Sequence, residues 1–531
     1  MFNLTKDSYF KGIRCFIHSK IIPYFIIAIG IILYLRQYLN NRCLWHDEAI
    51  LCLDIIRLPV ISFLHQPLPY KESAPFGFLV VEKLFVSILG TGEYALRLYP
   101  FIAGITSLWL FFRMLKTYLN SEAVVSGLFV FAVTPALVYY SSETKTYYTD
   151  ILFALISYVV IAKSCLKELD WEKARVMGVL GAFIIWFSFP VIFVLLGIGV
   201  TLLIDAAVQR DETKFLKLGI IYFFWSMSFI LCYIFLLQHI AQTTAGDPEW
   251  QVGYISFTDI RSWLNVFINI LNYPIGIAHY LWLGPIIFFI GLYSFFKERK
   301  SDFLILFFPL LFTFLASGFH KYSCRNRLAL FLLPIILIII AKGIDEISVK
   351  FGKFKIVSVV LLTGILFYGS FVSTCIRFIK PEEREDARAS MSYVKENIKR
   401  GDVIYVYPGT LPTFEYYYSV RGFLFGKNVK ETWPIIYPLR PTNLECDLKK
   451  LQGLKRVWIL YSDNWTNGKI KIMGPKNKDY LFRYLFKLGG KMVDQFTGVN
   501  AGAYLFDLSK FSGVKNNEFS VKSEIKTLNS L

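Results

Sequence analysis

Long apolar runs separated by short polar segments make up most of the first 378 residues. Several of these runs reach about 18–22 residues, the length that crosses a hydrocarbon core of ~30 Å. The pattern predicts about eleven membrane-spanning helices, at residues 21–38, 94–114, 123–141, 148–165, 174–188, 190–206, 216–238, 276–296, 302–318, 327–342 and 354–377. Two further segments, 75–90 and 261–275, could be re-entrant or interfacial helices, so the expected range is eleven to thirteen.

The pattern changes in residues 379–531. The stretch PEEREDARASMSYVKENIKRGD predicts an amphipathic helix,. One stripe of that helix is apolar: Ala387, Met391, Val394 and Ile398. Three strand-like runs follow it, DVIYVYP, RVWILYS and GAYLFDL,. We therefore predict an α-helical polytopic membrane protein over residues 1–378 and a C-terminal α/β domain over 379–531.

Composition agrees with a membrane protein, since 55% of the 531 residues are hydrophobic and only 18% are charged,. The net charge of +18 does not indicate a nucleic-acid partner, because most Lys and Arg lie in short loops between spans, where they set topology,. Five alternate loops share this basic character, at residues 113–116, 163–175, 210–217, 297–300 and 342–355. With the basic N-terminus, they are predicted to be cytoplasmic. The first outer loop, 39–93, and the C-terminal domain then lie outside a plasma or inner membrane.

The eight cysteines form no CxxC pair and show no zinc-binding spacing,. A Cys43–Cys52 disulfide would close a tight loop, although a helix from about residue 47 would usually point the two sulfurs apart. A divalent metal ion is a possible cofactor, but no set of ligands has a compelling spacing.

Charged residues on the predicted outer face are informative because topology does not require them. They gather in three segments of the chain: His46, Asp47, Glu48, Lys71, Glu72 and Arg97 in and after the first outer loop; Glu143 and Lys145, beside Tyr147, in the second; Arg325 and Arg327 in the third. A carboxylate beside several cations suits one kind of reaction. The carboxylate takes a proton from an attacking hydroxyl, and the cations hold a phosphate that leaves.

The same residues also have structural interpretations. Asp47 could be the N-cap of a helix over EAILCLDII, with Glu48 in the first turn, where the helix dipole favours acids. Three basic side chains could be anchors at the membrane interface: Lys71, Lys145 and Arg325. His46 is more typical of a packing residue than of a metal ligand, and Tyr147 fits an interfacial aromatic belt.

Five motifs occur in order along residues 1–380: HDEA, KESAPFGFLVVEKL, GTGEYALRLYPFIAG, YYSSETKTYYTD and RLALFLLPIILIIIAKG. Together they resemble the C-type (GT-C) glycosyltransferase superfamily. The resemblance is strongest to the branch of the protein O-mannosyltransferases and the aminoarabinose transferase that modifies lipid A. The sequence departs from the family pattern twice, with Lys145 where Arg is commoner and Leu328 where Tyr is frequent.

The resemblance implies transfer of a sugar from a polyprenyl-phosphate donor to a hydroxyl of a lipid, protein or glycan, with inversion at the anomeric carbon. By motif position, Asp47 is the candidate base, and Glu48 is the second member of the acidic pair, with assistance to Asp47 or binding of an ion as its two alternative roles. Lys71 and Arg97 lie in motif positions associated with the donor phosphate or with the structure around it. The other candidate donor-phosphate residues are Lys145, Arg325 and Arg327. The candidate substrate-binding residues are His46, Glu72, Glu143 and Tyr147.

Two other functions fit a polytopic chain of this kind. A transporter or flippase of lipid-linked sugars usually places its charges near the bilayer midplane and shows paired repeats. Here the charges lie at one face and we find no repeat, so a transferase is the better interpretation. A non-catalytic scaffold for envelope assembly is the third alternative.

Overall fold

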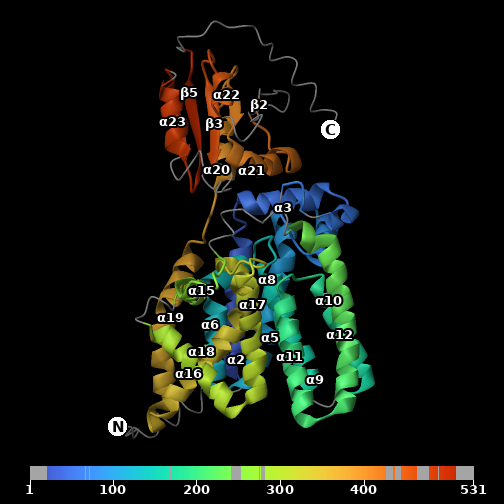
Figure 1. The fold of residues 1–531 in the computed structure, drawn as a ribbon. Coiled ribbons are helices and arrows are strands. Elements are labelled where there is room, and N and C mark those ends of the chain that lie inside the picture. Colours follow the sequence, from blue (N-terminus) through green and yellow to red (C-terminus); the bar gives the residue numbers. More distant parts are fainter. Residues whose placement is uncertain are drawn as a thin grey trace, which may run out of the picture. The chain divides into compact units, whose positions relative to one another are not determined.

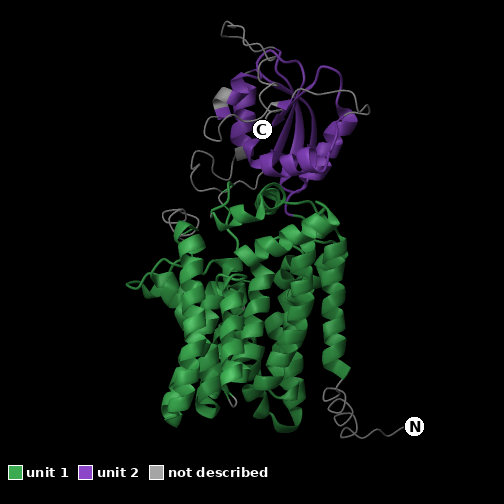
Figure 2. Cartoon of the chain, turned by 90° about the vertical axis from the view of Figure 1, so that its right-hand side faces the viewer, with its two compact units in different colours: residues 1–383, 467–469 green, residues 384–466, 470–531 purple. Residues whose placement is uncertain are grey.

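The computed structural model describes most of the chain, in two compact units. The described residues are 21–65, 67–70, 72–166, 169–240, 253–273, 276, 282–425, 435–436, 444–462, 477–487 and 489–509. Unit 1 comprises residues 1–383 and 467–469, and unit 2 comprises 384–466 and 470–531 (Figure 2). The sequence analysis places the boundary after residue 378.

Unit 1 is a helical bundle, which confirms the predicted fold class. Within its described residues, eight helical segments are long and apolar enough to cross a membrane. They are Ile21–Leu39 (α2), Glu93–Tyr118 (α5), Tyr147–Leu166 (including α8, Tyr147–Ile156), Val191–Gln209 (α11), Glu212–Ile240 (including α12, Glu212–Cys232), Lys300–Gly318 (α17), Asn326–Val349 (η5, Asn326–Leu332, and α18, Leu333–Val349) and Gly352–Ile379 (including α19, Lys355–Ile379). Figure 1 shows these helices running alongside one another.

Three of the eleven predicted spans are helices that fall short of this length. They are α6 (Ser121–Val133), α10 (Trp171–Ile185) and α16 (Leu283–Glu298). The predicted run 123–141 is divided because α7 (Pro135–Tyr140) begins with a proline. The residue before a proline is pushed out of the helical region, and Thr134 accordingly has an extended backbone,. The described residues therefore contain eight full-length spans rather than eleven.

The surface of the bundle suits a lipid environment. Several large apolar side chains on its helices are exposed, including Phe25, Phe183, Phe223, Phe289 and Leu361. Inside the bundle α18 is almost wholly buried. A Cβ atom at Gly291 of α16 or Gly343 of α18 would collide with a backbone carbonyl of the other helix, so these glycines allow the two helices to pack closely,.

The chain between α2 and α5 forms short helices. α3 (His46–Arg57) lies across one end of the bundle (Figure 1) and is followed by η1 (Val60–Leu64) and α4 (Phe76–Leu89). The Lys83 ammonium of α4 donates hydrogen bonds to the carbonyls of Ile55 and Ile56, at 2.9 and 2.8 Å, and so caps the C-terminus of α3,. The two segments expected to be re-entrant or interfacial are helical, as α4 and α15 (Ile260–Asn272).

Unit 2 contains a five-stranded sheet in the order β2-β1-β3-β5-β4. The strands are β1 (Val403–Val406), β2 (Ile435–Ile436), β3 (Val457–Ser462), β4 (Lys491–Thr497) and β5 (Ala501–Asp507). β1 is parallel to both β2 and β3, whereas β5 is antiparallel to β3 and β4. The described helices of this unit are α20 (Ala387–Asn397), α21 (Leu411–Glu415), α22 (Leu444–Lys449) and α23 (Asn477–Lys487).

The structure confirms the helix and the three strands predicted in this region. Ala387, Met391 and Val394 are buried on one side of α20, while Ile398 is half-buried just after the helix ends. The sequence analysis missed β2 and β4. β4 is an edge strand whose residues alternate between exposed and half-buried positions, and it carries too few apolar side chains to stand out in the sequence.

Candidate functional site

The acidic pair lies in the first turn of α3. The helix begins at His46, its N-cap is Trp45, and no side chain caps it. The interpretation of Asp47 as the N-cap is therefore wrong, although both acids occupy the turn where the helix dipole stabilises negative charge,. Adjacent helical residues point about 100° apart around the axis. Asp47 and Glu48 consequently meet different surroundings.

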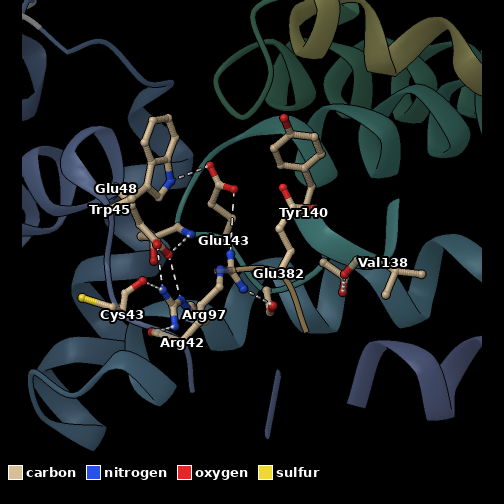
Figure 3. Close-up of polar contacts among 12 residues, drawn as sticks. Arg42, Cys43, Trp45, Glu48, Arg97, Val138, Tyr140, Glu143 and Glu382 are labelled. Carbon is tan, nitrogen blue, oxygen red and sulfur yellow. Dashed lines mark hydrogen bonds and ion pairs between the residues drawn. The ribbon is translucent and has the colours of Figure 1, made fainter. Parts of the chain in front are cut away.

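Glu48 is fully buried and holds Arg97 with both carboxylate oxygens (Figure 3). Arg97 donates to it from Nε at 2.8 Å and from Nη2 at 2.7 Å, and the Thr144 amide donates at 3.0 Å. Arg97 also donates to the backbone carbonyls of Arg42 and Cys43, at 2.7 and 3.4 Å. Burial alone would raise the pKa of Glu48, but the Arg97 guanidinium outweighs it and holds that pKa below its usual range. This pair joins α3, α5 and the turn before α8.

Asp47 is partly exposed and pairs with a different arginine. The Nη2 atom of Arg327, in η5, donates to its Oδ2 at 2.7 Å. The Arg327 guanidinium lies over two aromatic rings, at 5.2 Å from the Trp45 centroid and 5.4 Å from that of Tyr147. Burial opposes ionisation of Asp47, but the positive charges of Lys145 and Arg327 outweigh burial and lower its pKa. Asp47 is therefore ionised at neutral pH.

Lys145 and Glu72 form a third ion pair beside Asp47. The Lys145 ammonium donates to Glu72 Oε2 at 2.8 Å, and the lysine side chain is almost wholly buried while the glutamate is 28% exposed. Lys145 also acts on Asp47 through its charge. The three outer segments predicted from the sequence thus meet at one end of the bundle, as their charges suggested.

A fourth pair was not anticipated from the sequence. Arg42 is buried, donates to Ser142 Oγ at 2.8 Å, and places Nη2 at 3.8 Å from Glu143 Oε2 (Figure 3). Its guanidinium lies 4.2 Å from the Tyr139 ring centroid. The indole N–H of Trp45 donates to Glu143 Oε1 at 3.3 Å. Arg42 and Trp45 lie shortly before the acidic pair in the sequence. A basic residue at the end of an apolar bundle was the signal that could have identified Arg42.

The remaining predicted site residues are Lys71, Arg325 and His46. Lys71 is outside the described residues. Arg325 is exposed just before η5, and it is Arg327 that pairs with Asp47. His46 is buried, and in the described part of the chain no three His, Cys, Asp or Glu side chains lie together as metal ligands.

The cysteines beside the acidic pair do not form a disulfide. Cys43 and Cys52 are both buried and are not joined to each other. α3 begins between them and includes Cys52.

Two further buried acids lie near this end of the bundle. Burial and the nearby charge of Glu72 raise the pKa of Asp54, in α3, to about 7. Burial also raises the pKa of Glu82, in α4, well above its usual range, and neither of its carboxyl oxygens has a hydrogen-bond partner among the described residues. Both groups therefore favour the protonated form more than an exposed acid does.

Comparison with known proteins adds to this geometry. The profile of the family described as "Dolichyl-phosphate-mannose-protein mannosyltransferase" matches residues 73–233. The structure of ArnT from Cupriavidus metallidurans in the apo state superposes with a TM-score of 0.51 at 11% identity, covering 93% of this chain and 99% of that one. The chain has the GT-C glycosyltransferase fold.

Two further GT-C structures were also found. ArnT bound to undecaprenyl phosphate superposes with a TM-score of 0.50 at 10% identity and the same coverage. The oligosaccharyltransferase AglB from Archaeoglobus fulgidus, in complex with an inhibitory peptide and a dolichol-phosphate, has a TM-score of 0.46 at 11% identity, covering 94% of this chain and 76% of its own. No curated protein matches the chain significantly.

The family profile and the two ArnT structures confirm the resemblance predicted from the ordered motifs. The mannosyltransferase profile match includes the segments that carry Arg97 and Lys145, and it excludes Asp47, Glu48 and Arg327. The roles of individual residues therefore depend on the geometry described above.

Neutralising Glu48 is expected to destabilise the fold. Glu48→Gln removes the carboxylate that pairs with the buried Arg97 charge, and breaking a buried pair costs about 3–5 kcal/mol,. Thermal unfolding of the purified protein in detergent should show a clearly lower midpoint. Lys173→Gln, which breaks the exposed Lys173–Asp170 pair, is the control and should leave the midpoint nearly unchanged,. A Glu48→Gln midpoint equal to that of the wild type would contradict a structural role.

Asp54 should make stability depend on pH. Its raised pKa means that the folded protein keeps a proton that the unfolded chain loses between about pH 4 and pH 7, so stability falls as pH rises through that window,. Asp54→Asn should therefore raise the unfolding midpoint at pH 8, by about 1–3 °C, and change it little at pH 4. An equal effect at both pH values would show that ionisation of Asp54 is not the cause.

Proposed function

We propose that this protein transfers a sugar from a polyprenyl-phosphate donor to an acceptor hydroxyl at the outer face of the membrane. The observation that carries the proposal is the partly exposed Asp47 carboxylate beside Arg327 and Lys145 at one end of a membrane bundle. A base and two cations are the groups that such a transfer requires. ArnT, which has a similar fold, was solved with undecaprenyl phosphate bound, and this supports a lipid phosphate as donor carrier.

In the proposed reaction the acceptor hydroxyl attacks the anomeric carbon of the sugar. Asp47 takes the hydroxyl proton as the new carbon–oxygen bond forms. The bond between the anomeric carbon and the phosphate oxygen breaks, and its electron pair remains on the leaving polyprenyl phosphate. Attack from the opposite side inverts the configuration. Arg327 and Lys145 stabilise the charge that develops on the phosphate.

Glu48 and Arg97 receive positioning roles in this scheme. Arg97 has its donors directed to Glu48 and to two backbone carbonyls, so we assign it to holding the start of α3 rather than to the donor phosphate. Lys71 stays a proposed phosphate ligand on the strength of its motif position. Glu143 acts through Trp45, whose ring contacts Arg327.

Removing the base should abolish transfer without unfolding the protein. Asp47→Asn keeps the shape of the side chain but cannot accept the proton, and loss of a general base typically costs about 10²–10⁴-fold in rate. The assay would use protein reconstituted in bilayers, a panel of undecaprenyl-phosphate-linked sugars and membrane-extract acceptors, and would measure released undecaprenyl phosphate. Full activity of Asp47→Asn would refute the assignment. Translocation of the lipid without any transfer would indicate a flippase instead.

The two cations should determine affinity for the lipid phosphate. Arg327→Gln and Lys145→Gln each remove a charge-assisted hydrogen bond, so the Kd for undecaprenyl phosphate should rise about tenfold or more. Binding can be measured by thermophoresis of the full chain in nanodiscs. Lys321→Gln makes the same charge change in the same predicted outer segment as Arg327 and should alter Kd less than about twofold. If all three variants weaken binding equally, the effect is one of general charge.

A further inference from the structure

The two acids at the start of α3 each pair with one arginine, but the two pairs differ in kind. Glu48 accepts two hydrogen bonds from Arg97, and both side chains are at most 2% exposed. Asp47 accepts one hydrogen bond from Arg327, and these side chains are 24% and 31% exposed. A buried bidentate pair is fixed in place. A partly exposed single contact exchanges readily for another anion.

Arg327 can bind a second anion without leaving its position. A guanidinium carries five N–H donors, and the bond to Asp47 uses Nη2,. The rings of Trp45 and Tyr147 contact its face, and cation–π contacts hold a guanidinium by its plane while the N–H edge stays available to acceptors,. Because the Arg327 side chain is 31% exposed, a phosphate can share its guanidinium with Asp47.

The charges change in opposite directions during the proposed transfer. Asp47 is a carboxylate before the reaction and becomes neutral when it accepts the hydroxyl proton. The phosphate carries one negative charge as a diester in the donor, and between one and two as the monoester that leaves. The attraction of Arg327 for Asp47 therefore falls while its attraction for the phosphate rises.

We propose that Arg327 is a cation shared by Asp47 and the lipid phosphate. Before transfer it pairs mainly with the Asp47 carboxylate, and as the sugar is transferred it pairs mainly with the leaving phosphate. The inference rests on the proposed function and adds to it a coupling between proton transfer and departure of the phosphate. The acceptor proton moves to Asp47 as the anomeric carbon–phosphate bond breaks, with its electron pair on the phosphate oxygen. Arg327 thus acts on both the base and the leaving group.

A double-mutant cycle on phosphate binding tests the shared cation. The probe is undecaprenyl phosphate, titrated at pH 8 into the full chain in nanodiscs. Asp47→Asn removes the competing anion, so the Kd should fall roughly five- to tenfold. Adding Asp47→Asn to Arg327→Gln should change the Kd by less than about twofold, because the cation that the two anions share is gone.

Two controls separate this coupling from a general loss of negative charge. Asp54→Asn removes another acid of α3 that is not paired with Arg327 and should change the Kd less than about twofold,. Thermal unfolding of each variant shows that it is folded. The shared cation is refuted if Asp47→Asn leaves the Kd unchanged, or if it tightens binding equally in the Arg327→Gln background; the proposed transferase would survive either result. If the wild type binds no undecaprenyl phosphate, both proposals fail.

Discussion

The buried ion pair between Glu48 and Arg97 is the interaction on which the candidate site depends. Two charges removed from water are stable only when their hydrogen-bonding groups are satisfied, and here the carboxylate has three donors while the guanidinium also reaches two backbone carbonyls,. Those partners come from α5, the chain before α3 and the turn before α8. The pair therefore fixes where α3 begins, and with it the direction of the adjacent Asp47 side chain.

One consequence is that neighbouring acids of the same sequence pair have separate roles. The rotation of about 100° per helical residue turns Glu48 into the bundle and leaves Asp47 at its partly exposed edge,. Burial keeps Glu48 paired with Arg97, whereas partial exposure allows Arg327 to exchange Asp47 for another anion. A base has to exchange partners during catalysis, so the exposed member is the one suited to chemistry.

Much of this could be predicted from the sequence, because hydrophobic length and basic loops are strong signals in membrane proteins. These two signals predict the helical bundle, and they place the segments of Asp47, Lys145 and Arg327 at the same end of it. The pairing within that cluster could not be predicted, since it depends on side-chain directions that differ by one residue. The motif position of Arg97 allows contact with the donor phosphate or a role in the structure around it, and only the structure shows that Arg97 pairs with Glu48. Hydrophobicity alone predicts one continuous span over residues 123–141, but the helix is interrupted before Pro135.

The charge balance of the site bears on how a transferase would use it. Among the described residues, the basic side chains of the cluster each have an acidic partner: Arg97 with Glu48, Arg327 with Asp47, Lys145 with Glu72 and Arg42 with Glu143. Because the four pairs neutralise one another, the site has little net positive charge with which to attract the donor phosphodiester in the ground state. It gains positive excess only when Asp47 becomes protonated, at the moment when the leaving phosphate gains negative charge. Attraction that is stronger in the transition state than in the ground state is the kind that raises the catalytic rate rather than merely tightening binding.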